Sequence, residues 1–211
     1  MQTDFVMTHK IHFETKELAA MHETELFRIK YQAMDKVAHL FGEASQELKK
    51  VIGHYNLPSE VREKRAKIFR GENYLQLPYV VMDYPALFGT ENIFAYRTMY
   101  WWGNFFSFTI QLSGEFLHMY KNSLLSNIGS LAGKNIYFCI NSTPWQYHYE
   151  AENYVSVDEV IKKTGIIEKQ ISERNFIKLS RSIKISEWDN LSQVCAETFQ
   201  QFMQVAGMSE K

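Results

Sequence analysis

Arginine side chains within apolar segments are the clearest candidates for chemistry in this chain. Between residues 73 and 114 the only formally charged side chains are Asp83, Glu91 and Arg97. Arg181 takes a similar position in a later segment, on the apolar side of an alternating apolar and polar pattern. An unpaired buried charge costs several kcal/mol, so each arginine needs an acidic partner or a ligand. Because guanidinium groups bind carboxylates and phosphates through paired hydrogen bonds, a small anion is the ligand class to expect.

The predicted strand register gives Arg97 an acidic partner. A tight hairpin at residues 103–104, Gly-Asn, places Arg97 opposite Ile110. Arg97 would then share an apolar face with Met99, Trp101, Phe106 and Phe108. A turn centred on Thr90 places Asp83 directly across from Arg97, with Cβ atoms about 5 Å apart. The sequence therefore predicts a buried Asp83–Arg97 pair.

Three functional interpretations of these residues remain open. The sequence favours the first, in which Asp83 and Arg97 fix the sheet register, Arg181 extends to an edge, and the protein is a non-catalytic domain with a structural or interaction role. In the second, the arginines and His148 line a pocket for a small carboxylate or phosphate. In the third, Asp83 or His148 is the base of an enzyme. The candidate ligand-binding residues are Asp83, Arg97, His148 and Arg181, and no catalytic residue is assigned.

Other combinations of reactive residues are incomplete. His9, His12 and Glu14 have a spacing suited to metal ligands, but a metal site needs three or four ligands and no matching cluster follows. Cys139 and His148 could act as thiol and base, but a cysteine between apolar residues in a strand pattern is typical of core packing. The common serine-hydrolase, phosphate-loop, dinucleotide and zinc-peptidase motifs do not occur in the sequence. We therefore predict no metal and no cofactor.

The elements that would position these residues are mostly strands. Period-two patterns and turn residues predict a mostly antiparallel sheet of about five to six strands, at residues 74–85, 93–101, 105–112, 135–141, 145–150 and 176–185. The prolines that bound the run 78–85 suggest an edge strand. The regular alternation of 176–185 predicts an outer strand, with Lys178 on its solvent side.

Helical periodicity predicts a long amphipathic N-terminal helix from Thr15 to Gly53. At 1.5 Å per residue it would be about 58 Å long, so a break is expected before Phe27 or near Gly42. Its apolar stripe either packs on the sheet or forms the seam of a homodimer. A basic run after Ser59 predicts a solvated helix face, and further helices are predicted at 115–131, 156–165 and 186–206. The fold class is therefore α+β, with the antiparallel sheet packed against a long N-terminal helix and a C-terminal helix.

Composition and charge limit the partners. Of 211 residues, 45% are hydrophobic and 22% charged, which is typical of one soluble domain over residues 1–211, with 1–14 as a flexible or edge segment. The 23 basic and 24 acidic residues do not favour nucleic acid or an anionic membrane surface. Cys139 and Cys195 lie in apolar patterns that suit reduced thiols, and no signal segment or long apolar run occurs. We expect a cytoplasmic protein that binds neither nucleic acid nor membranes.

The middle third of the chain carries one family resemblance. The strings PYVVMDYPALF and RTMYWWGNFFSFT, at residues 78–88 and 97–109, are similar to an uncharacterised bacterial protein family with a DYP and WWGNFF aromatic pattern. The resemblance implies no activity, cofactor or site residue.

Overall fold

The computed structural model describes residues 11–162 and 171–208. The chain divides into two compact units, Met1–Lys36 and Val37–Lys211. Within the described residues, no helix is long and apolar enough to cross a membrane.

The first unit is helical. It contains helix α1 (Thr15–His22) and the beginning of helix α2 (Thr24–Ile52), whose remainder belongs to the second unit. Glu23 has non-helical backbone angles and separates the two helices. The expected break before Phe27 is therefore confirmed. His9, considered above as a metal ligand, lies outside the described residues.

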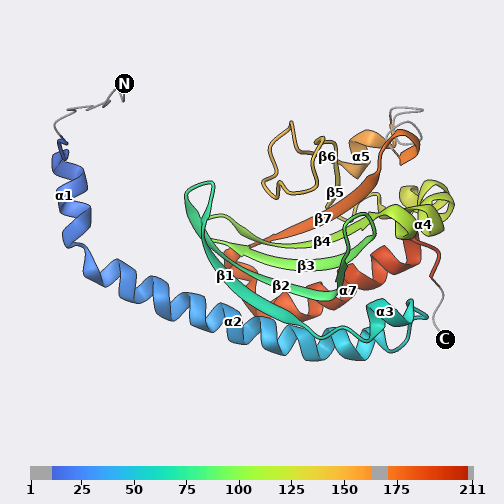
Figure 1. Cartoon of the computed structure of the whole chain (residues 1–211), viewed down its shortest axis with the longest axis horizontal. Coiled ribbons are helices and arrows are strands. Elements are labelled where there is room, and N and C mark those ends of the chain that lie inside the picture. Colours follow the sequence, from blue (N-terminus) through green and yellow to red (C-terminus); the bar gives the residue numbers. More distant parts are fainter. Residues whose placement is uncertain (1–10, 163–170, 209–211) are drawn as a thin grey trace, which may run out of the picture. The chain divides into compact units, whose positions relative to one another are not determined.

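The described residues of the second unit form one sheet of seven strands in the order β1-β2-β3-β4-β7-β5-β6 (Figure 1). The strands are β1 (Lys67–Tyr74), β2 (Leu77–Phe88), β3 (Ile93–Trp101), β4 (Phe105–Ser113), β5 (Ile136–Cys139), β6 (Tyr154–Ser156) and β7 (Phe176–Lys184). All neighbouring strands pair antiparallel. The predicted antiparallel sheet is confirmed, with slightly more strands than expected. The basic run assigned to a helix face in fact leads into β1, and residues 145–150 form an irregular segment instead of the predicted strand.

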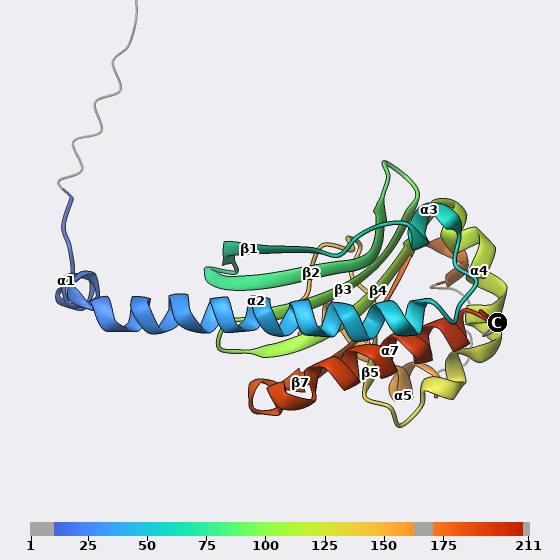
Figure 2. The same cartoon turned by 90° about the horizontal axis from the view of Figure 1, so that it is seen from below.

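Helices cover one face of this sheet (Figures 1 and 2). They are the part of α2 from Val37 onward, α3 (Ser59–Arg62), α4 (Gly114–Asn127), α5 (Val157–Val160), α7 (Leu191–Val205) and the 3-10 helices η1 (Ile128–Leu131) and η2 (Ile185–Asn190). Phe41 of α2 meets Phe106 of β4 with ring centroids 6.3 Å apart. Phe199 and Phe202 of α7 pack edge-on against Tyr96 of β3. The α+β class and the packing of the C-terminal helix are therefore confirmed.

The other face of the sheet is polar where β4 and β7 pair. On β4 the polar side chains alternate with apolar ones and are buried: Ser107, Thr109, Gln111 and Ser113. Segment 141–153 lies over this face. The Tyr149 hydroxyl lies 2.5 Å from Ser180 Oγ, which in turn lies 2.7 Å from Thr109 Oγ. The polar face is therefore enclosed by protein instead of solvent.

The β3–β4 connection differs from the predicted tight hairpin by one residue. Residues 102–104 form the loop, Trp101 pairs with Phe105, and Arg97 pairs with Thr109 instead of Ile110. Gly103 supplies the positive φ of +72° that this loop requires. A shift of one residue exchanges the two faces of a strand, so Arg97 lies with the polar side chains of β4.

Two predicted edge positions are wrong. Strand β7 lies between β4 and β5, and β2 lies between β1 and β3. Pro85 is tolerated inside the sheet because the β2–β3 register shifts between Asp83 and Ala86, where a missing N–H breaks no regular ladder bond. The alternation of apolar and polar residues along β7 predicted its two faces correctly, but both faces are covered by other parts of the protein.

Candidate functional site

Asp83 and Arg97 form the predicted pair across β2 and β3. They are direct partners in the strand register. Arg97 Nε and Nη2 donate to the two carboxylate oxygens of Asp83 at 2.7 and 2.8 Å. The remaining nitrogen, Nη1, donates to the Tyr147 hydroxyl at 2.7 Å. The Arg97 and Asp83 side chains are 15% and 7% exposed. The guanidinium group is therefore largely buried, and each of its nitrogens has a protein partner.

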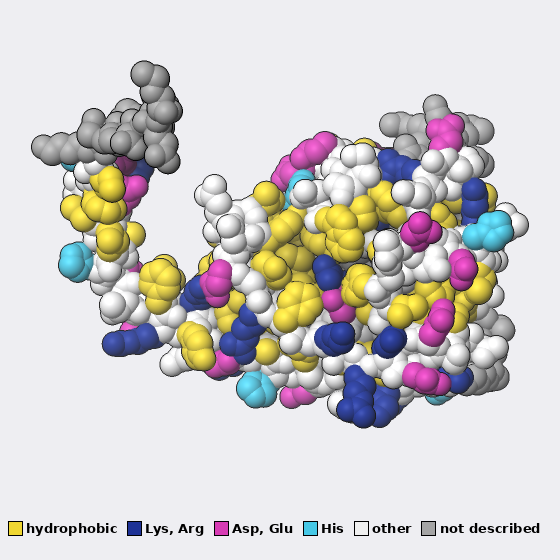
Figure 3. Space-filling view, viewed as in Figure 1, with side chains coloured by type: hydrophobic (Ala, Val, Ile, Leu, Met, Phe, Trp, Pro, Cys, Tyr) yellow, Lys and Arg dark blue, Asp and Glu magenta, His cyan; other side chains and the backbone are white. Residues whose placement is uncertain are grey.

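Aromatic rings surround this guanidinium group. Arg97 Cζ lies 5.2 Å from the ring centroid of Tyr147, and 5.7 and 5.8 Å from those of Phe88 and Phe69. Figure 3 shows apolar side chains gathered over the strands of this unit. Burial lowers the pKa of Arg97, but the hydrogen bonds and charges of Asp83 and Tyr147 outweigh burial and raise it overall. Arg97 stays charged and fully engaged, as the structural interpretation requires.

The other two predicted site residues lie elsewhere. His148 Nδ1 lies 3.0 Å from the Tyr74 hydroxyl, and its Nε2 lies 3.4 Å from a carboxylate oxygen of Glu152. Arg181 projects from the helix-covered face of β7, where its Nη1 donates to Thr198 of α7 at 3.4 Å. The two predicted arginines therefore point to opposite faces of the sheet and do not line one cavity.

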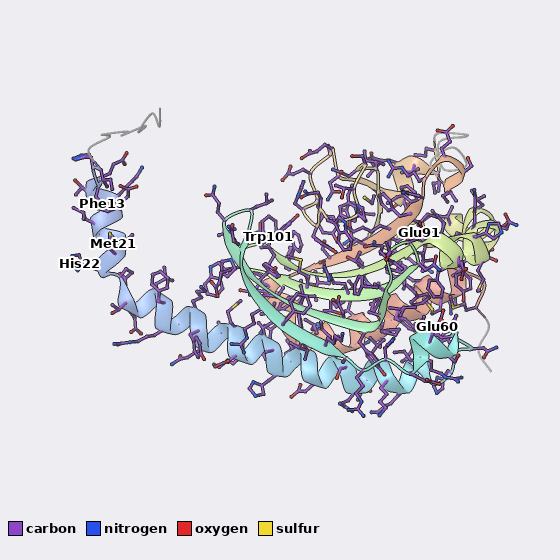
Figure 4. The ribbon with its side chains drawn as sticks, viewed as in Figure 1. Phe13, Met21, His22, Glu60, Glu91 and Trp101 are labelled. Carbon is purple, nitrogen blue, oxygen red and sulfur yellow. The ribbon has the colours of Figure 1, made fainter. Side chains whose placement is uncertain are left out.

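A cavity of about 660 Å³ lies at the end of the sheet where β3 begins, β4 ends and β7 begins. The start of α4 and segment 142–145 complete its wall. Its charged and titratable lining residues are Glu91, His118, Lys121 and Arg174. Glu91, in the turn before β3, marks this end of the sheet in Figure 4. Apolar lining comes from Ile93, Leu117, Trp145 and Phe176, so the cavity combines cations with an apolar wall.

Gln111 is a lining residue of this cavity, and its amide nitrogen is buried. The residue is 4% exposed, and its Nε2 makes no hydrogen bond to any residue that the structure describes. Leaving such a donor unsatisfied costs on the order of 1 to 3 kcal/mol. The 14-residue helix α4 begins at Gly114 in the same wall, where the helix dipole favours negative charge. This wall of the cavity therefore combines a buried polar residue, Gln111, with the positive potential of a helix start.

Two basic side chains hold the cavity wall through backbone oxygens. Arg174 donates to the three carbonyl oxygens of residues 139–141. Lys178 Nζ donates to the carbonyl oxygens of Pro144, at 2.8 Å, and Gln146. Within residues 11–162 and 171–208, neither cation forms an ion pair with a carboxylate. Their charges are therefore not neutralised by an acid at this end of the sheet.

Lys178 is buried beneath segment 141–153, although its strand pattern had predicted a solvated side chain. It is 0% exposed and pairs across the strands with Gln111. Its Nζ lies 4.0 Å from the ring centroid of Tyr147 and 5.1 Å from that of Tyr154. Burial lowers the pKa of Lys178 to about 7. Lys178 is therefore a positioning residue for the cavity wall and a group whose charge changes near neutral pH.

The alternative reactive sites are not assembled. Cys139 Sγ lies 3.7 Å from Asn153 Oδ1, and burial raises the pKa of its thiol, which disfavours the nucleophilic thiolate. His148 has the separate contacts given above. In the part of the chain that the structure describes, no group of three or more His, Cys, Asp or Glu side chains could hold a metal ion.

Sequence reasoning missed the cavity residues Gln111, Lys121 and Arg174. The alternation of polar and apolar residues along β4 could have identified Gln111 as a polar side chain in a buried strand. Lys121 and Arg174 carry no comparable signal, because they lie on a helix and before a strand that only the tertiary fold brings together.

The fold and the cavity define an α+β protein with an antiparallel sheet and a partly cationic cavity at one sheet end. Comparisons of the chain with protein-family models, curated proteins and solved structures find no match in any of the three. A function therefore has to be inferred from the cavity itself.

Proposed function

We propose that the protein binds a small anionic molecule in the cavity at the end of the sheet. The observation that carries this proposal is Gln111, a cavity-lining residue whose buried amide nitrogen makes no hydrogen bond to any described residue. An incoming carboxylate or phosphate oxygen would satisfy it. Lys121 and Arg174 in the same wall, together with the start of α4, supply positive potential for such a group.

The size and lining of the cavity indicate a ligand with an apolar body. A volume of about 660 Å³ falls within the range of about 300 to 1,000 Å³ that is usual for small-molecule sites. Inorganic phosphate would fill little of it. Trp145 and Phe176 offer an apolar surface beside the cations. An aromatic or aliphatic carboxylate, or a phosphate ester, satisfies both parts of the wall.

Binding is better supported here than catalysis. No described lining residue is a cysteine, and the lining acid Glu91 and base His118 are both exposed. The Asp83–Arg97 pair keeps its structural role in this proposal, because both partners are already satisfied. The protein is therefore a binding domain whose ligand is held by donors and cations.

Calorimetric titration with benzoate, phenyl phosphate and inorganic phosphate tests the proposal, with neutral benzamide as the matched control ligand. We expect an aromatic anion to bind the parent protein and to raise its melting temperature, while benzamide does neither. Gln111→Leu and Lys121→Met should each weaken that binding about tenfold or more, because each removes a donor to the anion.

Lys49→Met is the control variant, because Lys49 is exposed on α2 and does not line the cavity. It should bind like the parent. Binding of benzamide as strong as that of benzoate, or unchanged affinity in both cavity variants, would contradict the proposal.

A further inference from the structure

The first unit exposes an unusual amount of apolar surface. Eight large apolar side chains between residues 11 and 31 are 46% to 84% exposed: Ile11, Phe13, Leu18, Met21, Leu26, Phe27, Ile29 and Tyr31. Phe13 and Met21 are labelled in Figure 4, and Figure 3 shows apolar side chains covering much of α1. Large contiguous apolar patches on a protein surface mark interaction sites.

This surface belongs to helices that need a partner. Helix α1 has eight residues and buries none of them, and isolated helices of that length are marginal in water. In α2 the buried stripe that includes Met34, Val37 and Phe41 continues at the same helical spacing to Tyr31 and Phe27, which are exposed. Because the apolar stripe of α2 continues from buried residues into exposed ones, we infer that another molecule covers its exposed part.

The apolar surface approaches the size of a standard interface. Phe, Tyr and Trp side chains bury on the order of 150 to 250 Å² each, and three of the eight are Phe or Tyr. Eight large apolar side chains that are about half exposed or more therefore offer several hundred Å², which approaches the roughly 800 Å² that each partner contributes to an interface of standard size. A further apolar pair, Leu26 and Ile29, lies on a different face of α2 from Phe27 and Tyr31, so cover is needed on more than one side.

The two halves of this unit, residues 11–25 and 26–36, carry opposite net charges. Residues 11–25 hold four acidic side chains and one basic, for a net charge of −3 with His neutral. Residues 26–36 hold three basic side chains and one acidic, for a net charge of +2. An antiparallel pairing of two copies places each acidic half against the basic half of the other. Such an interface presents the same patch twice, as a two-fold symmetric dimer requires.

We propose that residues 11–36 form a homodimer interface, in which the helices of one copy pack antiparallel on the same helices of a second copy. Apolar side chains from both copies form the centre of the interface. The opposite net charges of the two halves set the antiparallel direction. The partner is thus a second copy of this chain, and the proposal does not depend on the anion-binding cavity.

Light scattering coupled to size exclusion on the full chain tests the interface. We expect the parent at twice the chain mass of 24.8 kDa, and the double variant Phe27→Ser with Tyr31→Ser at 24.8 kDa at the same concentration. Trp188→Ser is the control, because Trp188 is similarly exposed, at 57%, but lies in the second unit. It should remain dimeric. A parent at 24.8 kDa, or a double variant that stays dimeric, overturns the proposal.

Charge exchange tests the antiparallel pairing separately. Glu17→Lys with Glu23→Lys makes both halves basic, and Arg28→Glu with Lys30→Glu makes both halves acidic. Each variant alone should be monomeric, and an equal mixture should recover a dimer. Circular dichroism establishes that both variants are folded. If both variants dimerise alone, or if their mixture stays monomeric, the antiparallel pairing is contradicted. If the parent is monomeric and binds phosphatidylglycerol vesicles, the surface binds a membrane instead of a second copy.

Discussion

Removing one partner of the Asp83–Arg97 pair should destabilise the protein strongly. Asp83→Asn keeps the shape of the side chain but leaves the guanidinium charge, 15% exposed, without its counter-ion. Breaking a buried pair costs about 3 to 5 kcal/mol. Because an amide oxygen and the Tyr147 hydroxyl can still accept hydrogen bonds from Arg97, we expect about 3 kcal/mol, the lower end of that range. For a domain of this size that lowers the melting temperature by about 6 to 12 °C, measured by calorimetry.

Two comparisons make this result specific. Glu47→Gln breaks an exposed pair with Lys50, whose side chains are 50% and 69% exposed, and should cost less than about 1 kcal/mol. Replacing both buried partners, with Arg97→Met and Asp83→Leu together, should recover much of the loss, because no uncompensated charge remains. If Asp83→Asn melts like the parent, or the double variant is as unstable as Asp83→Asn, the reasoning is refuted. If Arg97→Met alone is as stable as the parent but no longer responds to benzoate, Arg97 serves a ligand instead.

Two further predictions concern the covered faces of the sheet. The pKa of Lys178 is about 7 in the folded chain and about 10.4 when unfolded. Between these two pH values the unfolded chain therefore binds more protons than the folded chain, so the stability of the parent rises with pH. From pH 7 to about 10 the parent should gain at most about 4 to 5 kcal/mol of stability relative to Lys178→Met, with little change below pH 7. Urea unfolding of both proteins across this range measures the difference, and a flat or falling difference would sink the prediction. Phe202 is 1% exposed against Tyr96, so Phe202→Ala should cost about 3 to 5 kcal/mol in the same assay, and an unchanged midpoint would mean that α7 does not pack there.

The charged pair was predictable because its partners are close in sequence. Asp83 and Arg97 lie 14 residues apart in adjacent strands, and the turn between them has a recognisable composition. Beside this turn Phe88 pairs with Ile93, one residue away from the predicted register, and the register shift between Asp83 and Ala86 restores the Asp83–Arg97 pairing. The neighbouring register was not predictable to one residue, because a Gly-Asn sequence fits a two-residue or a three-residue loop. That single residue decides whether Arg97 faces Ile110 or Thr109, and hence whether its surroundings on β4 are apolar or polar.

The side of β7 on which Lys178 lies was also predictable, but its burial was not. Alternation separates two faces of a strand without showing which of them water reaches. The polar face is closed by segment 141–153, whose residues 145–150 alternate like a strand but form none in the structure. The lysine itself binds that segment through Pro144 and Gln146. A polar strand face covered by an irregular segment looks the same in the sequence as a solvated one.

The charges of the two sites are used differently. At Asp83–Arg97 an acid and a tyrosine satisfy the guanidinium group, and nothing is left over for a ligand. At the end of the sheet the hydrogen bonds that Arg174 donates to described residues go to carbonyl oxygens, and the Gln111 amide nitrogen is buried without a partner among the described residues. Because a buried donor and an uncompensated cation both cost free energy, a fold that places them in one cavity is stabilised when an anion binds there. The arginine that stood out in the sequence is fully paired within the protein, and the proposed binding site lies where segments distant in sequence meet.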